Sequence, residues 1–179
     1  EGTLFQLEEQ LGAAAPEALR RVRLVLLSHL HGDHTLGLFA LLLRRRELPG
    51  AEELFVVAPP NVLPMLRAFV ELTDERLLRV VSTAQLQPLC EAATPPGEAA
   101  TLRWFEPRKA AALADLRALC ARHGVGELLP VPVEHCAGAV AFLLGFAGRR
   151  VAYSGDCRPS ALLARLAHGA DLLIHECTF

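Results

Sequence analysis

The chain lacks several features that would assign it to a specialised class of protein. No uninterrupted apolar run approaches the ~20 residues that a membrane-spanning helix needs. The longest run, Leu36 to Leu43, is followed by three arginines and predicts a buried helix. With a formal net charge of −2, the chain also lacks the basic excess that indicates nucleic-acid binding. We therefore expect no membrane partner. Any RNA contact must come from locally arranged charge or from another part of the protein.

Cysteine pairs with metal-binding spacing are also absent. The five cysteines have no CxxC spacing, so the sequence predicts neither a zinc ribbon nor a disulfide framework; they are Cys90, Cys120, Cys136, Cys157 and Cys177. This pattern favours a reducing compartment. Aromatic residues make up only 6% of the chain, and we interpret Trp104-Phe105 as core rather than as a base-stacking platform.

What is present is enough apolar sequence for one core. The chain has 179 residues, of which 52% are hydrophobic, and this predicts a single globular domain. It opens without a methionine at Glu1 and stops at Phe179, directly after a strand-like segment. We therefore expect residues 1–179 to be a partial domain from a longer chain.

Short apolar runs alternate with helical stretches along the sequence. Helices are expected where the apolar period and the end signals agree, at 35–47, 61–72, 107–123 and 159–168. Strands are expected at 23–28, 54–58, 128–134, 140–146, 150–154 and 171–175. A loop is predicted at 91–100 and a tight turn at Gly148-Arg149. This order predicts an α/β fold built as a layered sandwich.

One segment concentrates metal-binding side chains. The sequence S-H-L-H-G-D-H places His29, His31, Asp33 and His34 directly after the strand expected at 23–28. Zinc takes imidazole nitrogen and carboxylate oxygen ligands. In a loop, the first two histidines would face one metal position, and Asp33 with His34 would face another. Gly32 would let the backbone turn between the two pairs.

Two further candidate ligands follow later strands. His135 comes after the strand expected at 128–134, and Asp156 follows the strand expected at 150–154. Taken alone, His135 is a satisfied core histidine and Asp156 an ordinary turn aspartate. Their occurrence together with S-H-L-H-G-D-H, each at a strand end where ligands collect, favours a shared metal site.

The complete pattern resembles the metallo-β-lactamase superfamily. HxHxDH, an isolated histidine and the aspartate of S-G-D occur there in this order. The resemblance implies an αβ/βα layered sandwich, truncated here at both ends, with a dinuclear site for two Zn²⁺ ions. It assigns His29, His31 and His135 to one zinc, Asp33 and His34 to the other, and Asp156 to both. The second zinc normally takes one more histidine from downstream, so the expected site is one ligand short.

Within the superfamily, the chain resembles ribonuclease Z. The matching segments are Glu1-Gly2-Thr3, Val57-Ala58-Pro59, YSGDCRP at 153–159 and DLLIHECTF at 171–179. Residues 136–155 leave room only for a hairpin, whereas short-form enzymes carry a tRNA-binding arm there. The chain is therefore similar to the C-terminal, catalytic half of a long-form enzyme.

This resemblance implies a zinc-dependent endoribonuclease that removes 3′ trailers from precursor tRNA and leaves a 3′-hydroxyl. Asp33 would orient the attacking water and act as general base, and Glu176 would support the ligands. Cys157 is interpreted as a small buried residue rather than as a thiolate ligand. The implied partners are precursor tRNA, the metal-free N-terminal half of the same parent chain, and a second copy in a homodimer. The implied location is mitochondrion or nucleus.

Two rival functions stay open at this point. One is a hydrolase of the same fold that acts on a small ester or thioester. The other is a non-catalytic RNA-binding half, inert because the last zinc ligand is missing. For Arg44, Arg45 and Arg46, and for Arg149-Arg150, phosphate contact is the alternative to a solvated helix end or turn.

Overall fold

The computed structural model describes residues 2–86 and 106–178, with side chains omitted for 106–110. The predicted loop at 91–100 lies outside these residues, as do Cys90, Trp104-Phe105 and Phe179.

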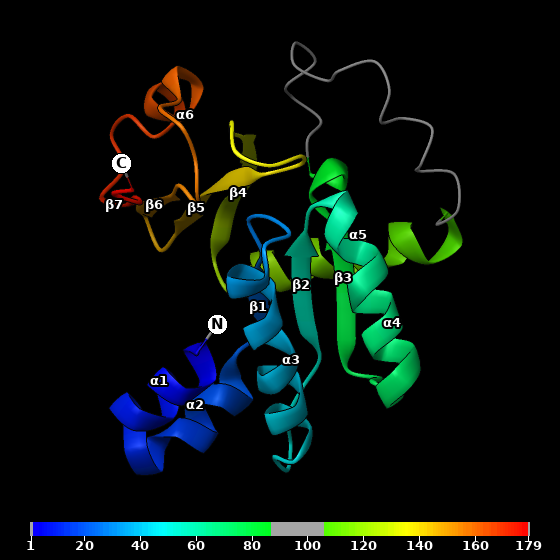
Figure 1. Cartoon of the computed structure of the whole chain (residues 1–179). Helices are drawn as coiled ribbons and strands as arrows, with labels where there is room; N and C mark the ends of the chain where they lie inside the picture. Colours follow the sequence, from blue (N-terminus) through cyan, green and yellow to red (C-terminus); the bar gives the residue numbers. More distant parts are fainter. Residues whose placement is uncertain (1, 87–105, 179) are drawn as a thin grey trace.

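The first sheet is parallel and is covered on both faces. Its strands are β1 (Leu24–Leu26), β2 (Leu54–Ala58) and β3 (Leu78–Ser82), hydrogen-bonded in that order. The helices α3 (Gly32–Arg46) and α4 (Leu63–Thr73) connect successive strands and pack on one face (Figure 1). Every residue of β2 is buried, as expected for the central strand of such a sheet.

The second sheet is mostly antiparallel. Its strands, in spatial order, are β4 (Val125–Pro132), β5 (Val140–Phe146), β6 (Arg149–Tyr153) and β7 (Leu172–Ile174). Only the β6–β7 pair is parallel, because α6 (Ala161–Leu166) makes the crossover between them. Leu163 of α6 packs against the outer face of this sheet with Ala141, Leu143 and Ala152.

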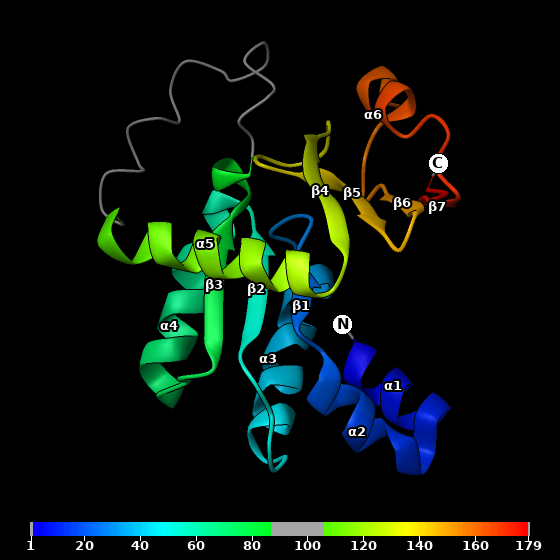
Figure 2. The same cartoon turned by 180° about the vertical axis from the view of Figure 1, so that it is seen from behind.

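The two sheets and α5 (Glu106–Arg122) share a central core. Phe55 and Val57 of β2 pack in one cluster with Leu116 of α5 and with Val140 and Phe142 of β5. Seen from behind, α5 crosses the parallel sheet on the face opposite α3 and α4 (Figure 2). The resulting layers are helices, sheet, sheet and helix, which confirms the predicted αβ/βα sandwich.

The structure adds elements that the sequence patterns did not predict. Two helices, α1 (Thr3–Leu11) and α2 (Ala15–Arg21), precede the first sheet, and β3 forms its third strand. Short 3-10 helices occur at Gly12–Ala14, Pro60–Val62 and Thr83–Gln85. The predicted turn is shifted by one residue, because Ala147 and Gly148 have the positive φ angles. Positive φ at both central residues is typical of a tight hairpin.

The arginine triplet at the end of α3 has structural partners. Arg45 is 2% exposed and donates to the carbonyl oxygens of Leu19 and Glu52, at 2.9 and 3.0 Å. Arg44 pairs with Glu8 and Glu47. The interpretation of Arg45 as part of a solvated helix end was wrong, because its guanidinium supplies donors to buried backbone carbonyls.

None of the described helices is long and apolar enough to cross a membrane.

Candidate metal centre

The candidate ligands come from the ends of strands in both sheets. β1 leads into His29 and His31, β4 is followed by His135, and β6 is followed by Asp156. The two sheets are joined here by a backbone hydrogen bond of 2.9 Å from Val140 N–H to the Ser28 carbonyl oxygen. This junction brings residues more than one hundred positions apart to one place.

Four of the six predicted ligands form one compact cluster. Potential ligand atoms of His29, His31, His135 and Asp156 all lie within 4.8 Å of one another. His135 Nε2 is 3.1 Å from His31 Nδ1. Tetrahedral zinc with bonds of roughly 2.0–2.2 Å separates neighbouring ligand atoms by roughly 3.3–3.6 Å. The cluster therefore fits one zinc ion with small adjustments.

The two carboxylate oxygens of Asp156 face different histidines. Oδ2 lies 3.8 Å from Nε2 of both His29 and His135. Oδ1 lies 3.3 Å from His34 Nε2, on the other side of the carboxylate. This division of contacts is what a carboxylate that bridges two metal positions requires.

His29 carries the strongest indication that a ligand belongs in the cluster. Its side chain is fully buried, and Nε2 has no hydrogen-bond partner among the described residues. A buried polar atom without a partner is costly, so such atoms are normally paired. Burial, followed by repulsion from His34, lowers the pKa of His29 to about 4. The imidazole is therefore neutral at pH 7, the state in which it binds a metal.

Asp33 and His34 lie in the first turn of α3 and not in a loop. The helix begins at Gly32, with His31 as its N-terminal flanking residue. Gly32 has no positive φ, so the predicted tight turn there was wrong. Asp33 Oδ2 is 3.2 Å from His34 Nε2. The helix start brings His34 Nε2 within 3.3 Å of Asp156 Oδ1 and places the Asp33 carboxylate at the positive end of the helix dipole. Neither Asp33 nor His34 belongs to the compact four-residue cluster.

Glu176 lies beside the loop that carries Asp156. Its carboxylate accepts a hydrogen bond from the backbone N–H of Cys157, and its own N–H donates to Ser154 Oγ at 3.1 Å. A hydrogen bond to Thr178, followed by the one from Cys157, lowers the pKa of Glu176. Its contacts are those of a residue that holds the Asp156 loop.

Cys157 is directed toward the same C-terminal segment. Its Sγ lies 3.9 Å from His175 Nε2, and burial, followed by Glu176, raises the pKa of the thiol. Cys157 is only partly buried, at the edge of the cluster around Leu163, so it is less buried than the sequence interpretation expected.

Asn61 was not predicted from the sequence, although it braces the His135 loop. Its side-chain Nδ2 donates to the Ala137 carbonyl oxygen at 2.7 Å. Gly138, at φ +75°, lies against the same side chain, because a Cβ there would be 3.3 Å from Asn61 Oδ1. A lone asparagine after a strand gives no sequence signal for this role, since the contact spans 76 positions.

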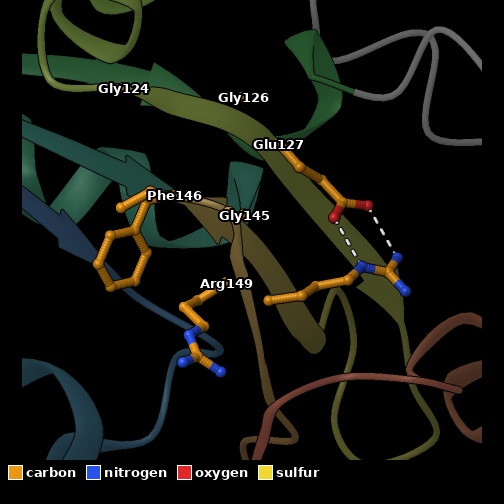
Figure 3. Close-up of a pocket in the computed structure, with 9 residues that line it drawn as sticks. Gly124, Gly126, Glu127, Gly145, Phe146 and Arg149 are labelled. Carbon is orange, nitrogen blue, oxygen red and sulfur yellow. Dashed lines mark hydrogen bonds and ion pairs between the residues drawn. The ribbon is translucent and has the colours of Figure 1, made fainter.

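Arg149 and Arg150 line a hollow of about 300 Å³ (Figure 3). Arg150 donates to both carboxylate oxygens of Glu127, at 2.7 and 2.9 Å. Arg149 donates to Asp171 at 2.9 Å. Both arginines therefore have carboxylate partners within the sheet region.

Comparisons with known proteins agree with this geometry. The profile of the β-lactamase superfamily domain matches residues 3–179. The chain is 31% identical, over its whole length, to a mitochondrial tRNase Z of Arabidopsis thaliana and to a zinc phosphodiesterase of the ELAC protein 2 type from Caenorhabditis elegans. It spans about a quarter of the length of these curated relatives, 23% in both cases.

Two solved structures share the fold. A long-form RNase Z from yeast superposes with a TM-score of 0.74 at 19% identity, covering 93% of this chain and 25% of that one. The short form of human tRNase Z gives a TM-score of 0.59 at 20% identity, covering 100% of this chain and 64% of that one. The chain thus belongs to the β-lactamase superfamily, with the metallo-β-lactamase fold and with ribonuclease Z proteins among its relatives.

Proposed function

We propose that this chain is the catalytic part of a zinc-dependent endoribonuclease that removes 3′ trailers from precursor tRNA. The names of its relatives support a tRNA-processing phosphodiesterase. The observation that carries the proposal is the division of Asp156, with one oxygen toward His29 and His135 and the other toward His34. Phosphodiester hydrolysis commonly uses two metals that share such a bridge.

The proposed ligand sets follow this division. His29, His31, His135 and Asp156 would hold the first zinc. Asp33, His34 and Asp156 would hold the second, and His34 Nε2 lies within 3.3 Å of both carboxylates. We also propose that residues 1–179 form one catalytic domain.

The chain's own residues then have separate roles in hydrolysis. Zinc at this site would supply a Lewis acid that neutralises charge on the phosphoryl oxygens and makes water more acidic. Asp33 orients the attacking water and accepts its proton at a carboxylate oxygen. Its side chain is 67% exposed, so water can reach it, and its Oδ2 lies 3.2 Å from His34 Nε2. Glu176 acts at a distance by holding the backbone next to Asp156.

The proposed cut follows the discriminator nucleotide and leaves a 3′-hydroxyl on the tRNA and a 5′-phosphate on the trailer. Recognition would rest mainly on the shape and backbone of the folded RNA. Arg44, Arg149 and Arg150 all have carboxylate partners, which favours an RNA grip supplied elsewhere. We propose that a metal-free N-terminal half of the same parent chain supplies it. The alternative source of this RNA-binding surface is a second copy of the chain in a homodimer.

The proposed location is the mitochondrion, since two of the relatives carry this word in their names. The nucleus is proposed only from the resemblance to long-form enzymes. Expression of the full-length protein with a fluorescent tag, beside organelle markers, tests both locations.

The substrate class is tested by offering the zinc-loaded full-length protein a precursor tRNA and a panel of small esters and thioesters. We expect RNA cleavage at one position, with 3′-hydroxyl ends mapped by ligation and sequencing, and little turnover of the small substrates. Efficient thioester hydrolysis without RNA cleavage would overturn the proposal. Zinc binding without turnover of either substrate class would favour a non-catalytic RNA-binding half.

A further inference from the structure

Two segments that carry metal ligands meet at one buried serine. Ser28 is 3% exposed and directly precedes His29, two residues after β1 ends. Its Oγ lies 3.0 Å from His29 Nδ1. Burial raises the pKa of the Tyr153 phenol, and a hydrogen bond from the Ser28 side chain opposes this rise. Tyr153 is the last residue of β6, three positions before Asp156. A chain of three side chains therefore connects the strand that leads to Asp156 with the imidazole of His29.

The direction of these hydrogen bonds follows from the free nitrogen of His29. A neutral imidazole has a single N–H, so one ring nitrogen donates and the other has a lone pair. Nε2 is the buried atom without a partner, and it faces the Asp156 carboxylate. For Nε2 to bind zinc, the proton must be on Nδ1 and must be donated to Ser28 Oγ. The Ser28 hydroxyl can then donate its own hydrogen to the Tyr153 oxygen.

Gly155 closes this arrangement from the other side. It has φ +57°, and a Cβ there would lie 2.8 Å from Ser28 Cβ and 3.1 Å from Ser28 Oγ. Only glycine leaves room for Ser28 in its present place. The S-H of the first motif and the Y-S-G-D of the second are therefore in direct contact, which neither motif indicates by itself.

We propose that Ser28 and Tyr153 are positioning residues that fix the tautomer and the ring orientation of His29 for zinc. This inference rests on the proposed zinc site and adds two residues that were not assigned to it. Hydrogen-bond partners of a metal-binding histidine typically change metal affinity by about 10–100-fold when removed. Tyr153 acts only through Ser28, so removing its hydroxyl should change zinc affinity only when Ser28 is present.

The test measures zinc affinity of the full-length protein by competition with a chromophoric chelator. Ser28→Ala should weaken zinc binding by about 10–100-fold. Tyr153→Phe keeps the packed ring and removes only the hydroxyl, so it should weaken binding by a smaller factor. In the double variant, Tyr153→Phe should add nothing to Ser28→Ala, because the connection is already broken.

A serine with a purely structural role provides the matched control. Ser160 Oγ accepts from Leu163 N–H at 3.1 Å and so caps α6. Ser160→Ala should lower the Tm of the metal-free protein but leave its zinc affinity unchanged. For Ser28→Ala, we expect the Tm increase caused by added zinc to shrink relative to that of the unmodified protein.

Unchanged zinc affinity in both Ser28→Ala and Tyr153→Phe would overturn the inference, and so would independent, multiplicative effects of the two substitutions. The proposed function is judged separately. If the unmodified protein binds zinc but cleaves no precursor tRNA, that function fails, and the affinity comparison still decides the role of Ser28.

Discussion

At the scale of single residues, burial separates the charged side chains that shape the fold from those available for chemistry. Arg45 and His29 are both buried, and no pattern in the sequence distinguishes them from exposed neighbours. Arg45 satisfies backbone carbonyls, whereas His29 directs an unpartnered nitrogen into the ligand cluster.

We predict that Arg45→Met destabilises the protein by roughly 2–4 kcal/mol, because buried carbonyl oxygens lose their donors. Arg44→Met is the control, since it removes only partly exposed ion pairs and should cost less than about 1 kcal/mol. Urea unfolding followed by circular dichroism measures both. Equal costs for the two variants would contradict the structural role of Arg45.

All six predicted ligands could be named from the sequence because each follows a recognisable strand and belongs to a recognisable motif. Four of them gather in the metal cluster, and His34 contacts the same aspartate. Asn61 and Ser28 could not be found in this way. Their contacts depend on how the chain returns to the site, and asparagine and serine are common in any loop.

At the scale of elements, one row of the antiparallel sheet shows how a glycine allows a long-range ion pair. Glu127, Gly145 and Arg150 are paired consecutively across β4, β5 and β6. Because Gly145 has no side chain, the carboxylate and the guanidinium meet across the middle strand (Figure 3). A Cβ at Gly145 would lie 3.0 Å from Glu127 Cβ.

This pair predicts a pH-dependent contribution to stability. The hydrogen bond from Arg150 lowers the pKa of Glu127 below its usual value near 4.3. A carboxylate whose pKa is lower in the folded state stabilises the protein at pH values above its unfolded-state pKa. This stabilisation is lost as the pH falls through the folded-state pKa. Glu127→Gln should therefore cost about 0.5–1 kcal/mol at pH 7, and the cost should disappear as the pH falls below about 4.

Urea unfolding of Glu127→Gln across that pH range provides the measurement. The control is Glu9→Gln, on the exposed surface of α1. A cost that is the same at pH 7 and pH 3 would contradict the ion-pair explanation.

Element boundaries were the weaker part of the sequence prediction. The start of α3 was placed three residues late, because three histidines and an aspartate resemble a loop. The helices α1 and α2 were missed, since both are short and largely exposed. β3 was missed because Arg79 interrupts its apolar run, and the structure pairs that arginine with Glu53, the residue before β2.

At the scale of the whole molecule, the candidate metal centre joins the two sheets. His29 and His31 follow the parallel sheet, while His135 and Asp156 follow strands of the antiparallel one. A metal at this junction connects elements that otherwise meet mainly through apolar packing.

Zinc should therefore stabilise the folded chain, by about 2.7 kcal/mol when free zinc is one hundred times its Kd. We predict a rise in Tm on zinc addition that is reversed by a chelator. His135→Ala should abolish most of this rise, whereas His123→Ala, at the end of α5, should preserve it. A rise that survives His135→Ala would place zinc elsewhere.

The number of zinc ions that the chain binds depends on whether the proposed second zinc site has enough ligands. The proposed ligands of that position among residues 2–86 and 106–178 are Asp33, His34 and the shared Asp156, one fewer than the four that zinc usually takes. We predict that this chain alone binds fewer than two zinc ions tightly, as measured by metal analysis after gel filtration. Two tightly bound ions per chain would contradict this count.

In the proposed function, Asp156 bridges a two-zinc site that cuts precursor tRNA, with Asp33 as general base. The most direct measurement is cleavage of an end-labelled precursor tRNA by the zinc-loaded, full-length protein beside Asp156→Ala and Asp33→Ala. We predict one cut after the discriminator nucleotide, which is lost in both variants while their folding is kept. A cut that survives Asp156→Ala would contradict the bridging role, and no cut by the folded, zinc-bound protein would contradict the nuclease assignment.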